Sequence, residues 1–183
     1  MKIKELKKIL ESKKSDFAVF YTQDSSRISP NMLYFSGYSG IGALVVPKKQ
    51  EPFLAVPEME CERAKKSVIK NVYTMEKKKF FESMQNILKR CGIQAKNIMI
   101  DKNNFTLNSY KYFKKQFKKV KISDTSQDCA RLREIKTDEE VTILKKSCSY
   151  ADKILQKSIK TNMFIKMENL FEAKGYSSFP SIA

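Results

Sequence analysis

Short apolar runs alternate with amphipathic helical segments along residues 1–124, and this alternation limits the possible folds more than any other feature. Apolar residues three and four apart indicate helices, and short runs rich in Val, Ile, Phe and Tyr indicate strands. The predicted strands span residues 16–21, 42–46, 52–56, 71–74, 97–101 and 120–123. The predicted helices span residues 3–14, 58–67, 80–91 and 107–117, with a short one from Pro30 that ends near Gly37. A polar hairpin turn at 47–51 makes the expected α/β sheet mixed rather than purely parallel.

After about residue 124 the strand pattern stops and a long helix follows. Thr137 and Glu140 form a capping box, in which each side chain bonds the backbone N–H of the other residue. Apolar residues then step by three and four along one helix face at Val141, Leu144, Cys148, Ala151 and Leu155. We therefore expect one domain over residues 1–124, and a linker with the start of a second domain over residues 125–183.

The formal net charge of +16 comes almost wholly from lysine. Arginine, whose planar fork reads phosphate and guanine, occurs at only five positions: Arg27, Arg63, Arg90, Arg131 and Arg133. The lysines fall mostly on helix faces, which favours a solvated surface. A nonspecific face for polyanions is the alternative, but we do not expect nucleic acid as a partner.

The four cysteines, Cys61, Cys91, Cys129 and Cys148, are tens of residues apart. This spacing supports neither a zinc ribbon nor a CxxC redox motif. The first residues do not resemble a signal peptide, and no apolar run approaches the roughly 20 residues that span a bilayer. We expect a protein of the reducing cytoplasm without a membrane partner.

The sequence contains no histidine, which excludes a Ser-His-Asp or Cys-His catalytic pair and a His-based zinc site within these residues. The glycines between Gly37 and Gly42 precede a strand instead of opening a helix, so they do not form a phosphate-binding loop. Residues 138–140 are acidic because they begin a helix. Three glutamates at 58, 60 and 62 could contact a metal, but a solvated helix face explains them better.

Two segments resemble the creatinase, prolidase and aminopeptidase P family. Residues 31–38, Asn-Met-Leu-Tyr-Phe-Ser-Gly-Tyr, are similar to the segment N-x-x-Y-L-T-G-F of its N-terminal domain. The following strand pair and a Pro-Glu-Met-Glu entry into the next helix match the order of that domain. Residues 132–152 are similar to the junction L-R-x-I-K-s-x-x-E-I…A…A-D, where this domain meets the metallopeptidase domain. The two segments lie about a hundred residues apart in the family's order.

The resemblance implies a mixed-sheet αβα N-terminal domain, followed by the first helices of a truncated pita-bread domain. In the family that second domain binds two divalent metal ions (Mn, Co or Zn) and cleaves bonds before proline. Its ligands lie beyond the segment that residues 178–183 resemble, so we assign no catalytic residue and no metal ligand. We expect this chain to bind no cofactor and to be inactive alone. Residues 161–174 also look too short for a family stretch and a further helix.

In relatives this domain borders the active-site cleft, often that of a neighbouring subunit, and restricts it to short peptides. The resemblance therefore implies short proline-containing peptides and a second copy of the chain, in a homodimer, as partners. Tyr38 is the candidate surface for a prolyl ring, and Arg27 is the candidate guanidinium for a peptide carboxylate. Alternatively, Tyr38 packs at a helix end and Arg27 is free in a loop.

A second function is compatible with the same residues. Some relatives with this fold have lost their metal ligands and act as protein-binding or chaperone-like modules. The alternative to a peptidase domain is therefore a catalytically dead pseudo-peptidase. Whether the complete protein is an enzyme stays open at this point.

Overall fold

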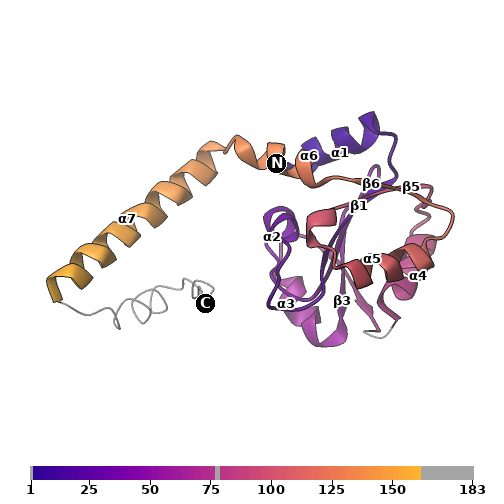
Figure 1. Cartoon of the computed structure of the whole chain (residues 1–183), viewed down its shortest axis with the longest axis horizontal. Coiled ribbons are helices and arrows are strands. Elements are labelled where there is room, and N and C mark those ends of the chain that lie inside the picture. The colour runs from indigo at the N-terminus through magenta and orange to yellow at the C-terminus, as the bar shows by residue number, and fades with distance from the viewer. Residues whose placement is uncertain (1, 77–78, 162–183) are drawn as a thin grey trace. The chain divides into compact units, whose positions relative to one another are not determined.

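Six strands form one sheet in the order β4-β3-β2-β1-β5-β6 (Figure 1). The strands are β1 (Phe17–Thr22), β2 (Gly42–Pro47), β3 (Phe53–Pro57), β4 (Asn71–Met75), β5 (Asn97–Ile100) and β6 (Lys121–Asp124). β2 runs antiparallel to its neighbours β1 and β3, and the three remaining strand pairs are parallel. The sheet is therefore mixed, as predicted. This computed structural model describes residues 2–76 and 79–161.

Helices cover both faces of the sheet (Figure 1). They are α1 (Lys2–Ser12), α2 (Pro30–Ser36), α3 (Cys61–Lys65), α4 (Phe80–Arg90), α5 (Leu107–Gln116) and α6 (Ser126–Glu134), with short 3₁₀ turns η1 (Glu58–Glu60) and η3 (Lys102–Asn104). One hydrophobic core lies against α4 and α5, and the other lies against α1, α2, α3 and α6. The predicted αβα architecture is confirmed.

The central strand β1 supplies side chains to both cores. Phe17, Val19 and Tyr21 point into the core beneath α4 and α5. Ala18 and Phe20 point into the opposite core, because successive strand residues face opposite sides of a sheet. A strand buried on both faces reads as a continuous apolar run. This requirement explains the sequence Phe-Ala-Val-Phe-Tyr.

Local signals set the ends of α2. The Ser29 hydroxyl accepts the backbone N–H of Met32 at 3.2 Å, and Pro30 occupies the first turn. At the other end Gly37 is left-handed (φ 67°), and its N–H donates to the carbonyl of Leu33 at 2.7 Å. The predicted start at Pro30 and stop at Gly37 are both confirmed.

Helix α6 was not predicted from the sequence. Its inward face is short: Cys129 is buried and Leu132 is partly buried against the core beneath α1. Lys2 Nζ donates to the carbonyl of Leu132 at 2.8 Å, and Lys13 pairs with Asp128 at 2.6 Å. These contacts link residues more than a hundred positions apart. The hydrophobic periodicity of these residues alone is therefore too weak to predict the helix.

The chain divides into two compact units, residues 1–134 and 135–183. α6 thus belongs to the first unit, while the assignment of residues 125–183 to a linker and a second domain stays a prediction. In the second unit α7 spans Asp138–Thr161. The predicted capping box is formed: Thr137 N–H donates to Glu140 at 2.7 Å, and Glu140 N–H donates to the Thr137 hydroxyl at 3.2 Å. Residues 162–183, which include most of the stretch that looked short, lie outside the described residues.

No helix in the described part of the chain combines the length and the apolar character needed to cross a membrane. α7 is long enough at 24 residues, but lysines and acidic residues recur along it.

Gly42 at the start of β2 provides a test of the strand packing. Its φ is +154°, and a Cβ there would come within 2.8 Å of both the Ala55 carbonyl and Val56 Cγ1 of β3. We expect Gly42→Ala to lower the free energy of unfolding by about 2 kcal/mol or more, from backbone strain and overpacking together. Urea denaturation followed by circular dichroism measures this change.

Gly37→Ala is the matched control, because Gly37 is also left-handed but has open space at its Cβ. Its conformational penalty alone is roughly 1 kcal/mol. Equal losses in the two variants would contradict the proposed steric role of Gly42.

Candidate functional site

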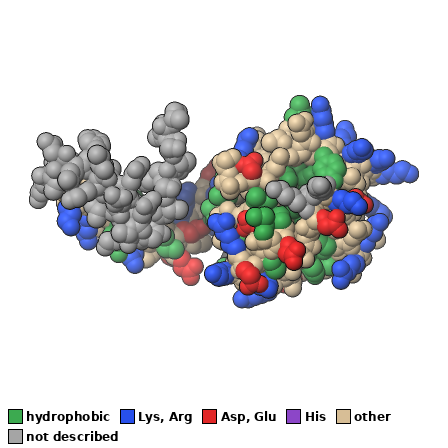
Figure 2. All heavy atoms as spheres, turned by 90° about the horizontal axis from the view of Figure 1, so that it is seen from below, with side chains coloured by type: hydrophobic (Ala, Val, Ile, Leu, Met, Phe, Trp, Pro, Cys, Tyr) green, Lys and Arg blue, Asp and Glu red, His purple; other side chains and the backbone are tan. Residues whose placement is uncertain are grey.

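The carboxyl ends of the five parallel strands gather at one edge of the sheet, where β2 begins. Ligands of open α/β sheets bind at such an edge. Both predicted substrate-binding residues lie in its loops: Arg27 follows β1, and Tyr38 precedes β2. Figure 2 looks toward this edge of the first unit and shows hydrophobic and acidic side chains nearer its centre, with Lys and Arg at the periphery.

Arg27 is exposed, and its guanidinium rests on η3. Nη2 donates to the backbone carbonyl of Asn103 at 3.1 Å. The preceding turn is fixed by Asp24, whose carboxylate accepts the backbone N–H of Ser26 at 3.0 Å and also its hydroxyl. The Ser26 hydrogen bonds, with a smaller effect of nearby Arg27, lower the pKa of Asp24. A guanidinium has several N–H donors, so Arg27 can hold η3 and still bind a carboxylate.

Asp101, directly after β5, organises this part of the edge. Its carboxylate is fully buried and accepts hydrogen bonds from Asn31 Nδ2 at 2.6 Å, Asn104 Nδ2 at 2.6 Å and the Ser126 hydroxyl at 2.9 Å. Buried carboxylates require such donors because losing water is costly. The three donors come from α2, η3 and the start of α6. Asp101 therefore holds η3 in place, and η3 is the segment to which Arg27 donates its hydrogen bond.

Tyr38 is buried, with 1% of its surface exposed. Its hydroxyl lies 2.9 Å from Glu60 Oε2 and 3.0 Å from the carbonyl oxygen of Ile41. Arg63 lies 3.8 Å from the same Glu60 oxygen and donates to the Ser39 hydroxyl at 3.3 Å. Burial first, and then Glu60, raise the pKa of Tyr38 well above its usual range. The phenol thus fastens the loop before β2 to η1.

Gly40 explains how this loop closes. A Cβ at Gly40 would overlap the Tyr38 hydroxyl and the Glu60 carboxylate. The absence of a side chain therefore permits the Tyr38–Glu60 contact. With its ring enclosed in this way, Tyr38 offers no open face to a prolyl ring in this conformation. Its role as a direct substrate contact stays a prediction.

An aromatic hollow of about 340 Å³ opens at the same edge. Its aromatic lining consists of Tyr21, Phe80, Phe81 and Tyr112. On its polar side Gln23 Oε1 accepts the Ser109 hydroxyl at 2.6 Å. Burial, followed by Asp24 and Tyr112, raises the pKa of Tyr21 to about 12, so its phenol is neutral near pH 7. The hollow can receive an apolar ring or aliphatic side chain.

Sequence reasoning missed both Asp101 and the aromatic hollow. Asp101 had one usable signal, because it is the last residue of a predicted strand, at the carboxyl end where ligands bind. The hollow had none, because residues between 21 and 112 come together only in the folded sheet. Arg27 and Tyr38 lie at different parts of the edge, beside η3 and η1 respectively.

The described residues do not fit a metal centre. They contain no group of three His, Cys, Asp or Glu side chains that could hold a metal ion. The Asp101 carboxylate already accepts amide and hydroxyl donors, and Glu58, Glu60 and Glu62, which were expected on a solvated helix face, do not act as one group. Glu60 pairs with Tyr38, whereas Glu62 pairs with Lys65 at 2.5 Å. No chemical step is therefore assigned to a metal held by these residues.

Because the phenol of Tyr38 is buried, the free energy of unfolding varies with pH in the alkaline range. Its folded pKa is raised, so its contribution is complete below the unfolded value of about 10 and is lost as the pH rises above it. We expect the unfolding free energy of the unmodified chain to fall more steeply than that of Tyr38→Phe between about pH 9.5 and 11. The difference in slope is at most about 1.4 kcal/mol per pH unit.

Urea denaturation at each pH measures both slopes. Tyr21 and Cys129, whose pKa values are also raised by burial, are present in both proteins, so the difference isolates Tyr38. Parallel curves would contradict a neutral, buried phenol at this position.

Comparison with known proteins places these features in a family. Residues 2–135 match the family described as the creatinase/prolidase N-terminal domain. An uncharacterized peptidase of Staphylococcus epidermidis is 29% identical over 160 residues, which cover 85% of this chain and 42% of that protein. The Xaa-Pro dipeptidase of Pyrococcus furiosus is 35% identical over 148 residues, which cover 79% of this chain and 39% of that protein.

The fold agrees with these sequence matches. The solved prolidase from Pyrococcus furiosus superposes with a TM-score of 0.73 at 27% identity, covering 93% of this chain and 52% of that one. The chain spans about two fifths of the length of the curated relatives it matches, at 42% and 39%. On the match over residues 2–135, the chain belongs to the creatinase/prolidase N-terminal domain family.

Proposed function

We propose that this chain forms the cleft-edge and oligomerisation domain of a proline-specific metallopeptidase that hydrolyses short Xaa-Pro peptides, as a dipeptidase or an aminopeptidase. The match of residues 2–135 to the family carries this proposal. It is supported by relatives named as a peptidase and an Xaa-Pro dipeptidase. Two divalent metal ions (Mn, Co or Zn) would supply the hydrolytic chemistry. They would be held by a metallopeptidase domain and not by the described residues.

The contribution of this domain is recognition at the edge of the cleft. Arg27 is exposed and oriented by η3, so it can bind the carboxylate of a short peptide. The aromatic hollow can receive an apolar side chain of the same peptide. Tyr38 would act on the substrate mainly through the loop that it fastens to Glu60. Such contacts favour short peptides. In a longer peptide the terminal carboxylate would lie farther from the scissile bond and would not meet Arg27.

Self-association is supported by exposed apolar side chains on neighbouring elements. Leu33 of α2, Met59 of η1 and Val68 after α3 are 44%, 79% and 66% exposed. The N–H of Val68 donates to the carbonyl of Ser36 at 3.1 Å, which joins the segment after α3 to the end of α2. Apolar surface of this kind is enriched in homodimer contacts.

Four free cysteines support a reducing cytoplasm as the compartment.

The purified chain provides the first test. With Mn²⁺ or Co²⁺ added, we expect no hydrolysis of a Met-Pro dipeptide or a proline-containing tripeptide above the buffer rate. The reason is that the described residues form no metal site. Product formation is followed by release of free proline. Metal-dependent turnover by this chain would contradict the assignment of chemistry to another domain.

A chimera tests Arg27. Residues 2–135 replace the matching region of the Pyrococcus furiosus Xaa-Pro dipeptidase. In this active background we expect Arg27→Gln to raise KM for the dipeptide about two- to fivefold with kcat little changed. An exposed guanidinium–carboxylate contact is worth roughly 0.2–1 kcal/mol in substrate binding.

Arg90→Gln is the matched control, because Arg90 is an exposed arginine at the end of α4. Equal KM values for the Arg27 and Arg90 variants would remove Arg27 from the substrate site. A folded, metal-loaded chimera without activity would contradict the proposed cleft-edge role of this domain.

A further inference from the structure

A second surface lies at the opposite edge of the sheet, away from Arg27 and the aromatic hollow. It forms where β1 and β5 begin and β2 ends. Two hollows of about 340 Å³ each lie there, and both are lined by Ile93 and Gln94. We call the pair the basic groove, defined by Lys48, Lys49, Lys89, Lys96 and the loop 92–94.

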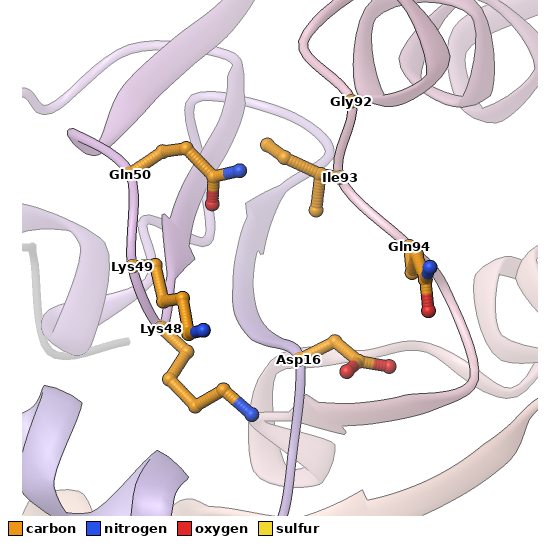
Figure 3. A pocket seen from close by; sticks show the side chains of 7 residues that line it. All are labelled: Asp16, Lys48, Lys49, Gln50, Gly92, Ile93 and Gln94. Atoms are coloured by element: carbon orange, nitrogen blue, oxygen red, sulfur yellow. The ribbon is translucent and has the colours of Figure 1, made fainter.

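The first hollow has walls from distant parts of the chain. Figure 3 shows Lys48, Lys49 and Gln50 on one side, Ile93 and Gln94 on the other, and Asp16 at one end. Lys7 Nζ donates to the carbonyl of Gln50 at 2.9 Å, which brings a further cation to this wall. The groove is therefore assembled by folding and not by a run of lysines.

The charge of the groove is unbalanced. Asp16 is the one acidic residue among those that line the two hollows. Its Oδ2 already accepts the backbone N–H groups of Lys96 and Asn97, each at 2.8 Å. None of the four lysines that define the groove forms an ion pair with a described residue. A ligand that supplies carboxylates would complement this surface.

The second hollow adds an apolar floor. Leu88, Ile93 and Phe117 line it beneath the exposed Lys89 and Lys96, together with Ala95. The aromatic Phe117 is only 2% exposed, so it cannot stack on a nucleobase. The lysine ammonium groups also lack the planar guanidinium of arginine, which binds a phosphate through two hydrogen bonds. This combination fits aliphatic side chains next to carboxylates better than a nucleic acid.

We propose that the basic groove is a docking site for an acidic segment of another protein. Carboxylates of the segment contact Lys48, Lys49, Lys89 and Lys96, and one aliphatic side chain enters the hollow over Ile93 and Ala95. The contact proposed for self-association involves other residues, Leu33, Met59 and Val68, so a second copy of this chain is not the proposed occupant. The site is independent of the proposed peptidase function, because it lies at the other edge of the sheet.

The test uses the full chain and a defined probe, a fluorescein-labelled dodecapeptide with the sequence Glu-Glu-Leu repeated. Fluorescence anisotropy at low salt is expected to show saturable binding. The double variants Lys48→Gln/Lys49→Gln and Lys89→Gln/Lys96→Gln are each expected to raise Kd about fivefold or more. In heteronuclear NMR spectra the amide signals of Gly92 and Gln94 shift with the peptide.

Lys66→Gln/Lys70→Gln is the matched control, with the same loss of charge at two exposed lysines outside both hollows. An equal loss of affinity in this control would overturn the proposal, because binding would then follow net charge alone. Equal affinity for a peptide with serine in place of leucine would overturn it as well. So would equally tight binding of a single-stranded oligonucleotide of the same charge.

Discussion

Strand β1 is the element on which the rest of the first unit depends. It pairs with β2 on one side and β5 on the other, and its alternate side chains fill both hydrophobic cores. A one-residue shift of its register would exchange the two sets of side chains between the cores. The two functional edges lie at opposite ends of β1. Asp16, directly before β1, accepts the N–H of Asn97 at the start of β5 at 2.8 Å, and Thr22 at the end of β1 accepts the N–H of Ser29 at 3.0 Å.

The sequence predicted those parts of the fold that depend on neighbouring residues. The six strands, the limits of α2 and the Thr137–Glu140 capping box follow from apolar runs, Pro30, Gly37 and a four-residue motif. Helix α6, the Asp101 cluster and the aromatic hollow depend on residues far apart in the chain. Asp101, for example, binds Asn31 from 70 positions away. Periodicity contains no information about such partners.

The buried position of Tyr38 gives a physical reason for the motif that surrounds it. Ser36, Gly37, Tyr38 and Gly40 are all used to build the turn between α2 and β2. The Ser36 hydroxyl donates to the carbonyl of Met32 at 2.5 Å and accepts the N–H of Tyr38 at 3.1 Å. Gly37 ends the helix, and Gly40 leaves room for the Tyr38–Glu60 contact. A motif that resembles a binding segment can therefore be explained here by the geometry of one loop. Arg27 has no comparable structural requirement beyond its single bond to η3.

The two edges of the sheet differ in charge, and this difference separates their possible ligands. The edge with Arg27 carries Asp24, Glu60 and the buried Asp101, each with its own hydrogen-bond donor. The positive charge of Arg27 therefore acts over a short range and in one direction, which suits one terminal carboxylate. The basic groove presents several lysines and a single acid, one oxygen of which is already held by two backbone N–H groups. Because exposed charges act over roughly a Debye length of 8–10 Å, the lysines of one hollow reinforce one another. A ligand with several carboxylates therefore favours the groove, whereas a short peptide with one carboxylate gains little there and depends on the fixed geometry around Arg27.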